Sequence, residues 1–475
     1  MTMPMSMPME SLFNGLGDTN DGGSMTHEAS KDTADAPVGD GGGDPQTPPH
    51  AYMPGPQVAR FVGGRGLAAL GDQFLLFAIP LLAYKLTGSA SQTGLIFLVE
   101  WLPRVIFLPV AGVFADRIRS YLLYIGSDFV RSALGLTAFA LMFLIPDGKF
   151  ITLCVLAAGM SVAGAQSYVA LEATLPRFVP MDQMVRAQSI IQGTEQTSEV
   201  IGPVLAALLA SALPTTSLLA VIGAVYGLTM LNTLSLRRWL RTETLAGAAG
   251  EPTTIRSVAT GIAEGVTTLL KLPAILGLVG LTMTVNLMVG VGMATSAATT
   301  VGVFHQPDKY YGALSTGAGI VGILTFFVVP KVTKRLNPFA ALMTSYSLIC
   351  LGGIGVGLAN TFTQYAVSYA VLLGTVGFFN VVIRTERVRR IPREHFAKTI
   401  AIIILLNQLS LPAAGLLVTL FTTSFSPQSI ALGSVIGSVC AVALLLPLLA
   451  RLRTYHAHPD PAPSHGQNDP ARDRN

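Results

Sequence analysis

Charged side chains occur inside several long apolar segments of this sequence, where ionised groups are costly. Five are carboxylates and two are guanidinium groups, and all lie in the first half of the chain: Asp72, Glu100, Arg104, Asp128, Arg131, Glu195 and Glu199. Charge buried in an apolar segment usually marks a path for a substrate, an ion or a proton. These seven residues are therefore our candidates for proton coupling or substrate contact.

The carboxylates outnumber the bases that can neutralise them. Desolvation and repulsion between like charges both disfavour the anionic form of excess buried acids, which then take up protons. Glu195 and Glu199 lie four positions apart, on one face of a helix, where like charges repel. A carboxylate in this situation can gain a proton on one side of a membrane and lose it on the other. The pattern therefore predicts proton coupling.

Some of these residues also have a purely structural interpretation. Asp128 with Arg131, and Glu100 with Arg104, have the spacing of static ion pairs within one helix. Such pairs would lower the cost of burial without any role in transport.

Arg65, another base in an apolar segment, is expected to extend its guanidinium group toward the cytoplasmic surface. Asp72 then has no other base close to it in sequence, which favours a functional role for Asp72. At ~1.5 Å of rise per residue, Asp72 and Arg104 both lie ~20 Å from the outer ends of their segments. This depth is where transporters with two helical bundles bind substrates and ions.

The composition is that of a membrane protein. Of the 475 residues, 51% are hydrophobic and 12% are charged, against about 25% charged in soluble domains. The mean hydropathy is +0.56. The small net charge of +4 gives no indication of nucleic-acid binding.

The sequence also lacks the patterns of common enzymes and metal sites. The three cysteines have no CxxC or Cys/His spacing, and there is no HExxH, GxSxG or phosphate-loop motif. We therefore expect no enzyme activity, no cofactor and no metal site.

The apolar segments predict an all-α membrane protein with twelve transmembrane helices in two six-helix bundles, because each segment is long enough to cross a ~30 Å hydrocarbon layer. The segments are 60–86, 92–114, 121–146, 150–174, 184–212, 215–236, 273–303, 310–331, 339–359, 362–384, 397–422 and 428–450.

Composition shifts divide the chain further. The expected parts are a disordered cytoplasmic tail at 1–57, a first bundle at 58–236, a cytoplasmic linker with an amphipathic helix at 237–272, a second bundle at 273–452 and a disordered cytoplasmic tail at 453–475.

Lys and Arg residues are unevenly distributed between the two sets of connections. Eighteen belong to one set and three to the other, namely Lys85, Lys149 and Lys309. By the positive-inside rule, the basic set and both termini lie in the cytoplasm. The second half has few buried charges. It offers amides such as Asn286 and Asn407 for substrate contact or helix pairing, and a basic cytoplasmic loop at 383–398.

The connection GVFADRIRS (112–120) resembles the GxLaDRxGRR signature of the major facilitator superfamily. The first two helices, with LGDQFLLFAIPLLAYKLTGSASQTG, and the fourth and fifth, with EATLPRFVPMDQMVRAQSIIQGTEQTSEVIGPV, are similar to its drug:proton antiporter branch, which includes enterobactin exporters and macrolide efflux proteins. The resemblance covers roughly 60–450 and implies transport by alternating access.

The resemblance also implies roles for two groups of residues. Gly112, Asp116 and Arg117 would form a hairpin that locks the cytoplasmic side, with Gly112 permitting close approach of a neighbouring helix. Gly193, Gly202 and Pro203 would provide close packing along the fifth helix, where the antiporter pattern is only partly present.

The function expected from these observations is proton-coupled export of an amphipathic small organic molecule across the bacterial inner membrane. A siderophore is the first choice of substrate, and multidrug or macrolide efflux is the alternative. A uniporter or importer, and a sensor that no longer transports, are further alternatives. The expected partners are the small-molecule substrate, protons and the lipid bilayer.

Overall fold

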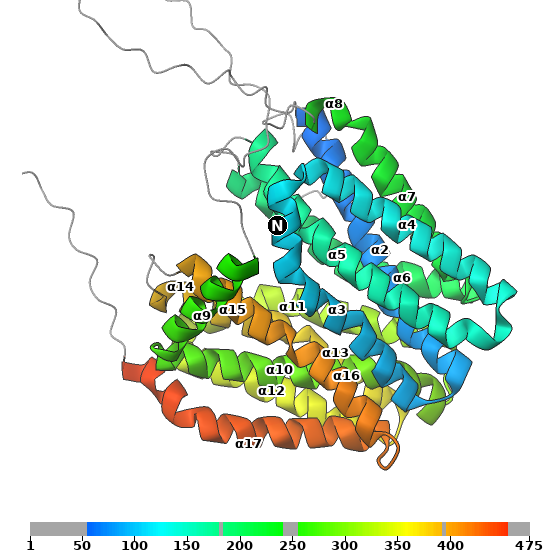
Figure 1. Ribbon diagram of the computed structural model, residues 1–475. Coiled ribbons are helices and arrows are strands. Elements are labelled where there is room, and N and C mark those ends of the chain that lie inside the picture. The colour runs from blue at the N-terminus through cyan, green and yellow to red at the C-terminus, as the bar shows by residue number, and fades with distance from the viewer. Residues whose placement is uncertain (1–54, 180–183, 241–254, 392–395, 455–475) are drawn as a thin grey trace, which may run out of the picture.

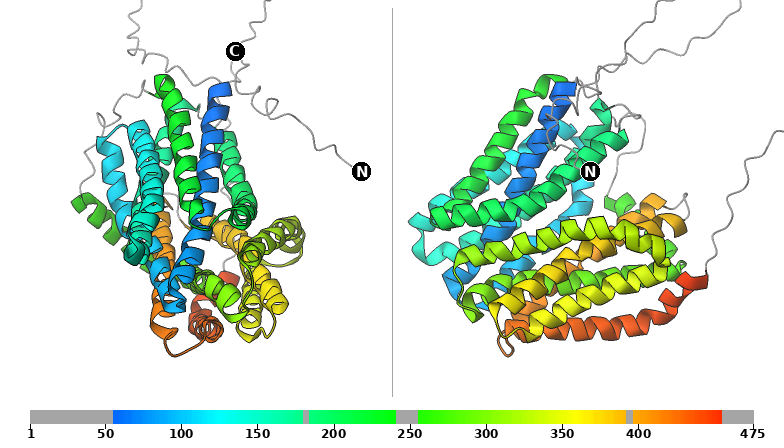
Figure 2. Two further views of the ribbon diagram at one scale, coloured as in Figure 1. Left: turned by 90° about the vertical axis from the view of Figure 1, so that its right-hand side faces the viewer. Right: turned by 180° about the vertical axis from the view of Figure 1, so that it is seen from behind.

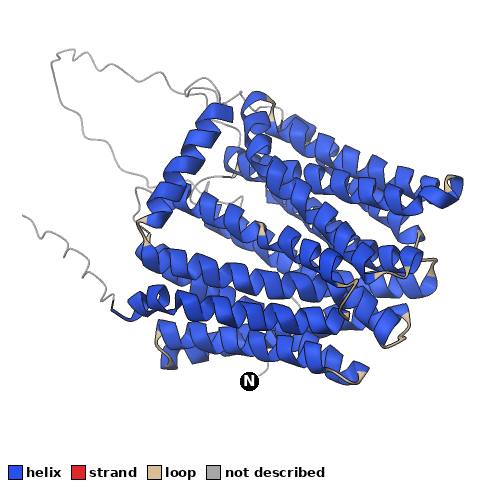
Figure 3. Cartoon of the chain, turned by 60° about the horizontal axis from the view of Figure 1, so that its bottom comes forward, coloured by secondary structure: helices blue, strands red, loops and turns tan. Residues whose placement is uncertain are grey.

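The computed structural model describes residues 55–179, 184–240, 255–391 and 396–454. The described chain is helical and contains no strand (Figure 3). The predicted disordered tails lie almost entirely outside the described residues. Helices satisfy their backbone hydrogen bonds internally, which is why apolar segments of this length take this form in a membrane.

Six long helices form the N-terminal half. They are α2 (Gly55–Thr87), α3 (Ala90–Arg117), α4 (Ser120–Leu144), α5 (Lys149–Phe178), α6 (Met184–Ala212) and α7 (Ser217–Ser235), with the short η2 (Pro146–Gly148) before α5. Where α4 and α7 cross, Gly135 lies against the backbone of Gly223. Such small residues allow membrane helices to approach closely.

The C-terminal half contains six spans, several of them interrupted. They are α10 (Pro273–Ala297) continued by η4 (Ala298–Val303), α11 (Asp308–Arg335), α12 (Pro338–Leu358), α13 (Phe362–Gly374) with α14 (Val376–Arg390), α15 (Phe396–Gln408) with α16 (Ser410–Phe421), and α17 (Pro427–Thr454). The break at Leu409 has a local cause, because Pro412 has no N–H to donate to the carbonyl of Gln408. η4 is a single π-helical segment.

Eleven spans in the described chain are long and apolar enough to cross a membrane, so the predicted number of twelve is not confirmed. The difference is α6, which was expected to be the fifth span. Its first half, MVRAQSIIQGTEQTSEV, is polar and carries Glu195 and Glu199. α6 is nevertheless a continuous helix that packs against α2 in the N-terminal half.

The two halves are joined through residues 236–272. Of this segment the structure describes α8 (Arg237–Leu240) and α9 (Ile255–Leu270). α9 is the amphipathic helix expected at 255–271, and it packs beside α15 (Figure 1).

In Figures 1 and 2 the two halves come together at one end of their helices and diverge toward the other end. We call the diverging end the basic face; it is the end at which α3 meets α4 and α11 meets α12. The opposite end, where α2 meets α3, is the far face. The structure therefore holds the halves apart at the basic face and together at the far face.

Close helix contacts join the halves toward the far face. Gly94 of α3 lies against Gly415 and Thr419 of α16, and Ser91 donates a hydrogen bond of 2.7 Å to the Thr419 carbonyl. On the other side of the interface, Ala207 of α6 lies against Gly312 of α11. Two glycine-containing crossings thus bring the far-face ends into contact.

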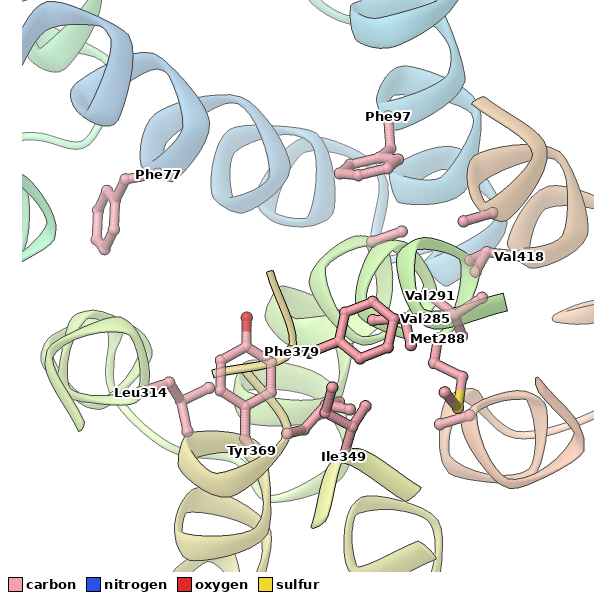
Figure 4. Close-up of a cluster of buried hydrophobic side chains, with 14 of the residues drawn as sticks. Phe77, Phe97, Val285, Met288, Val291, Leu314, Ile349, Tyr369, Phe379 and Val418 are labelled. Carbon is pink, nitrogen blue, oxygen red and sulfur yellow. The ribbon is translucent and has the colours of Figure 1, made fainter. Parts of the chain in front are cut away.

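Buried apolar side chains from both halves continue this interface inward. Figure 4 shows Phe77 of α2 and Phe97 of α3 facing a cluster from the C-terminal half. The labelled members of that cluster are Val285, Met288, Val291, Leu314, Ile349, Tyr369, Phe379 and Val418. Buried apolar packing is therefore continuous between the two halves.

Candidate functional site

Asp72 of α2 is the centre of a charge network that links three helices of the N-terminal half. The Arg131 guanidinium group of α4 pairs with Asp72 Oδ1, and Tyr226 of α7 donates a hydrogen bond of 2.7 Å to the same oxygen. Arg131 Nη2 also donates to Tyr226 Oη at 2.7 Å. Asp72 is thus paired with a base of another helix, although no base close to it in sequence was expected to reach it.

Arg65 lies about two turns before Asp72 on the same side of α2, and it joins the network to α6. Its Nε and Nη2 atoms donate hydrogen bonds of 3.0 and 2.8 Å to Glu195 Oε1, and its Nη1 lies 3.8 Å from Asp72 Oδ2. The Arg65 side chain is 12% exposed. The expectation that Arg65 extends toward the surface is wrong, because two carboxylates hold it inside the bundle.

Asp128 has a weaker connection to Arg131 than its spacing suggested. The Asp128 side chain is fully buried, and its Oδ1 lies 3.9 Å from Arg131 Nη1, too far for a hydrogen bond. Its Oδ2 accepts a hydrogen bond of 2.9 Å from Thr229 of α7. The closer acidic partner of Arg131 is Asp72, so Asp128 and Arg131 do not form the self-contained pair that their spacing allowed.

Glu100 and Arg104 of α3 do not form the intrahelical pair that their spacing favoured. Within the described chain, no carboxylate lies within 4.0 Å of the Arg104 guanidinium group, whose carbon is 5.8 Å from the centre of the Trp101 ring. Glu100 is 7% exposed, and its Oε2 has no hydrogen-bond partner. The Arg104 guanidinium group thus lies beside the Trp101 ring and not in an ion pair with Glu100.

Glu195 and Glu199 have different surroundings despite their common helix face. Glu195 is held by Arg65, and its second oxygen accepts a hydrogen bond of 3.2 Å from Gln192. Glu199 is exposed, and it has no cation within ion-pair distance among the described residues. The Arg65 guanidinium group therefore offsets the repulsion expected between the two glutamates.

The expected gating hairpin is a two-residue connection between α3 and α4. Arg117 is the last residue of α3 and is exposed, whereas the Asp116 side chain lies outside the described part of the structure. No described neighbour lies within 4 Å of a Cβ built at Gly112. The close approach expected at Gly112 is therefore not present in this conformation, in which the halves are apart at the basic face.

The two glycines of α6, the expected fifth helix, differ in their surroundings. Gly202 lies against Gln73 of α2, so a Cβ there would meet the Gln73 side chain, and Pro203 follows within α6. No described neighbour lies within 4 Å of a Cβ built at Gly193. Close packing is thus found at Gly202 and not at Gly193.

Two features of the C-terminal half were not found from the sequence. The segment 383–398 was expected to be a basic loop, but α14 continues to Arg390, and Glu386 is buried with an ion pair of 2.8 Å to Arg390. Buried Arg387 donates a hydrogen bond of 2.9 Å to Thr282 of α10. The i, i+4 spacing of Glu386 and Arg390 was the available signal.

The amides of this half tie helices together. Asn286 Nδ2 of α10 donates a hydrogen bond of 3.2 Å to the Asn407 carbonyl of α15. This bond matches the structural alternative considered for these amides.

An ion pair also crosses between the halves at the far face. Lys85 at the end of α2 pairs with Asp308 at the start of α11, and Lys85 Nζ donates a second hydrogen bond of 2.9 Å to Thr215 Oγ1. Asp308 and Lys85 are 223 positions apart, so no sequence spacing could indicate their contact.

Comparison with known proteins gives a family match and partial matches to efflux proteins. Residues 61–385 match the model of the Major Facilitator Superfamily. Macrolide efflux protein A of Streptococcus pyogenes is 29% identical over 164 residues, which are 34% of this chain and 40% of that protein. The chain thus aligns with less than half of the length of this relative.

Solved transporter structures share the fold at low sequence identity. The nucleoside transporter NupG superposes with a TM-score of 0.66 at 13% identity, covering 82% of this chain and 99% of the other. A bacterial homologue of the iron transporter ferroportin, in an inward-facing state, superposes with a TM-score of 0.63 at 16% identity, covering 84% and 99%.

Proposed function

Because the chain belongs to the major facilitator superfamily, we propose that it exports an amphipathic small organic molecule across the bacterial cytoplasmic membrane in exchange for protons. The family is one of membrane transporters, not enzymes. The substrate, the coupling ion and the direction are our proposal.

The observation that carries the proposal is the charge balance inside the N-terminal half. Once Arg65 is placed inside the bundle, three guanidinium groups face five carboxylates, and Asp72 is shared between two of the guanidinium groups. We expect the excess acids that are buried to change protonation or gain a cationic partner during a transport cycle, because isolated buried charge is strongly disfavoured. Proton exchange meets this requirement without another ion.

The arrangement of the halves supports alternating access. Contacts at the far face hold one side together, while the halves diverge at the basic face (Figure 2). If the basic connections lie in the cytoplasm, as their charge predicts, this conformation is open to the cytoplasm and ready to receive a molecule for export.

A siderophore remains the first choice of substrate. Arg104 is a half-buried guanidinium group with no carboxylate within ion-pair distance among the described residues, and it is flanked by the Trp101 ring. A free guanidinium group binds catecholate or carboxylate oxygens with charge-assisted hydrogen bonds, and the neighbouring ring suits an aromatic chelator.

Macrolide efflux is the second candidate, favoured by two observations. The first is the partial match to Macrolide efflux protein A. The second is Glu199, an exposed carboxylate that would attract the amino sugar of a macrolide. Uptake assays with both substrate classes distinguish the candidates.

The test is transport into inverted membrane vesicles with an imposed proton gradient, acidic inside. We expect uptake of a catecholate siderophore, loss of uptake when the gradient is collapsed, and a further loss with Asp72→Asn. Uptake of a macrolide but not the siderophore would select the second candidate. Uptake indifferent to the gradient would contradict proton coupling and indicate a uniporter.

A further inference from the structure

Glu100 is a buried candidate acid of the N-terminal half. It is in α3, the helix whose contact with α16 closes one side of the far face. Counting from Ala90 at ~1.5 Å per residue, Glu100 lies ~15 Å below the far face. On the opposite half, the ring centre of Tyr311 of α11 lies 5.0 Å from that of Phe77 of α2.

The surroundings of Glu100 provide no positive charge at contact distance. Its carboxylate makes no hydrogen bond or ion pair with any described residue, and Oε2 is buried. Every other ionised candidate in this half either has a polar partner or is at least partly exposed. A carboxylate enclosed in this way is tolerated in its neutral, protonated form and strongly disfavoured as an anion.

The titratable groups of the surrounding helices do not change this conclusion. The helices packed against α3 contribute charged or titratable groups that include Asp72 and Arg65 from α2, Asp128 and Arg131 from α4, Cys154, Tyr168 and Glu172 from α5, and Arg256 and Glu264 from α9, while α10 and α16 carry none. Asp72, Arg65 and Arg131 are engaged with one another and Glu195. Arg104 is one turn along α3 from Glu100, and no ion pair joins the two side chains.

We propose that Glu100 is the carboxylate that carries the transported proton, and that water at the far face reaches it only when the two halves part there. This inference rests on the proposed function. When the far face is open, Glu100 takes a proton from that water, and the neutral acid then allows the halves to close over it. Closure without the proton would bury an anion that has no ionic partner among the described residues.

Proton release is then linked to Arg104. Arg104 lies four residues from Glu100 on the side of the basic face, a spacing at which a salt bridge can form when the guanidinium group turns along the helix. Formation of that ion pair replaces the proton, which leaves to water at the basic face. In this sequence of steps one proton enters from the far side each time the protein, without substrate, closes at the far face and opens at the basic face. An exporter driven by protons requires this coupling.

The experiment follows opening of the far face as a function of pH, without substrate. Spin labels are placed on cysteines introduced at Leu213 and Ser424, which are exposed far-face residues of opposite halves, after Cys154, Cys350 and Cys440 are replaced. Purified full-length protein in lipid nanodiscs is compared with Glu100→Gln, Glu100→Asp and the matched control Glu264→Gln, whose glutamate is exposed on α9.

We expect the population with a closed far face to fall at least several-fold as the pH rises through the titration of Glu100. Glu100→Gln, which imitates the protonated form, should stay closed at every pH, while Glu100→Asp and Glu264→Gln should keep a pH response. A Glu100→Gln protein that elutes as a monodisperse species and opens with pH like the wild type would overturn the inference.

Vesicle transport separates this inference from the proposed function. If wild-type export ignores the proton gradient, the proposed coupling fails whatever Glu100 does. If wild-type export needs the gradient and Glu100→Gln export still does, coupling stands and its assignment to Glu100 is wrong.

Discussion

Arg65 and Glu195 lie 130 positions apart in sequence, and Nη2 of the arginine donates a hydrogen bond of 2.8 Å to Oε1 of the glutamate. The contact joins α2 to α6, the helix whose polar first half falls below the hydropathy of a membrane span. A polar helix is tolerated inside a bundle when its charges are paired there. The pair therefore explains how α6 takes its place in the N-terminal half.

The double substitution of Arg65 and Glu195 should destabilise the protein less than the sum of the two single substitutions. Arg65→Gln leaves Glu195 and Asp72 without a shared cation, whereas Arg65→Gln with Glu195→Gln removes the excess charge. We expect a coupling energy of about 0.5–3 kcal/mol in a double-mutant cycle measured by thermal unfolding in detergent. The matched control is Arg60→Gln, an exposed arginine of the same helix, with an effect below about 0.5 kcal/mol. Additive effects would show that the two residues act independently.

Removal of the Tyr226 hydroxyl should weaken the network without deleting a charge. The hydroxyl accepts from Arg131 and donates to Asp72, so Tyr226→Phe should cost about 1–3 kcal/mol of stability. Tyr310→Phe is the control, because Tyr310 is an exposed far-face residue whose hydroxyl has no such role. Equal melting temperatures for both variants would contradict the assigned hydrogen bonds.

The Lys85–Asp308 ion pair should bias the protein toward closure at the far face. The pair is partly exposed, so its contribution is expected to be about 0.2–1 kcal/mol. Asp308→Asn should then lower the ratio of closed to open far face by about 1.4- to 5-fold, measured by the same spin-label distances. The exchange of charges, Lys85→Asp with Asp308→Lys, should restore the ratio, and failure of this rescue would argue against an electrostatic role.

A methyl group at Gly94 should prevent full closure of the far face. A Cβ there would lie 2.7 Å from the Thr419 amide nitrogen and 2.9 Å from the Gly415 carbonyl oxygen, and backbone atoms cannot easily move aside. Gly94→Ala should therefore increase labelling of far-face cysteines by a membrane-impermeant reagent. Gly437→Ala in α17 is the matched control, because no described atom lies within 4 Å of the added Cβ. Unchanged labelling in Gly94→Ala would show that the contact is not needed for closure.

Replacement of Arg104 should separate the two proposed substrate classes. If Arg104 binds an anionic group, Arg104→Gln should weaken siderophore binding by about 10- to 100-fold, since a charge-assisted hydrogen bond contributes about 1.5–3 kcal/mol. Arg104→Lys should retain part of the affinity, and macrolide binding should change little. Binding by tryptophan fluorescence at Trp101 provides the measurement, and equal loss for both substrates would contradict an anion-binding role.

The sequence determined the class of this protein because its evidence is local. Apolar length, the charge bias between connections and the hairpin GVFADRIRS need no knowledge of which helices touch, and they predicted an all-helical transporter of two bundles that the family match confirmed. The same local evidence selected Asp72, Arg131 and Glu195 as charges inside the apolar segments, because their rarity there is visible in sequence alone.

Only the tertiary structure decided which charges meet. Spacing along one helix favoured Asp128 with Arg131 and Glu100 with Arg104, but the close partner of Arg131 is Asp72, and Glu100 has no ionic partner within the described chain. Helix rotation and crossing determine these contacts, and they depend on packing between segments far apart in sequence. For the same reason the inward direction of Arg65 and the Lys85–Asp308 contact appear only when the helices are assembled.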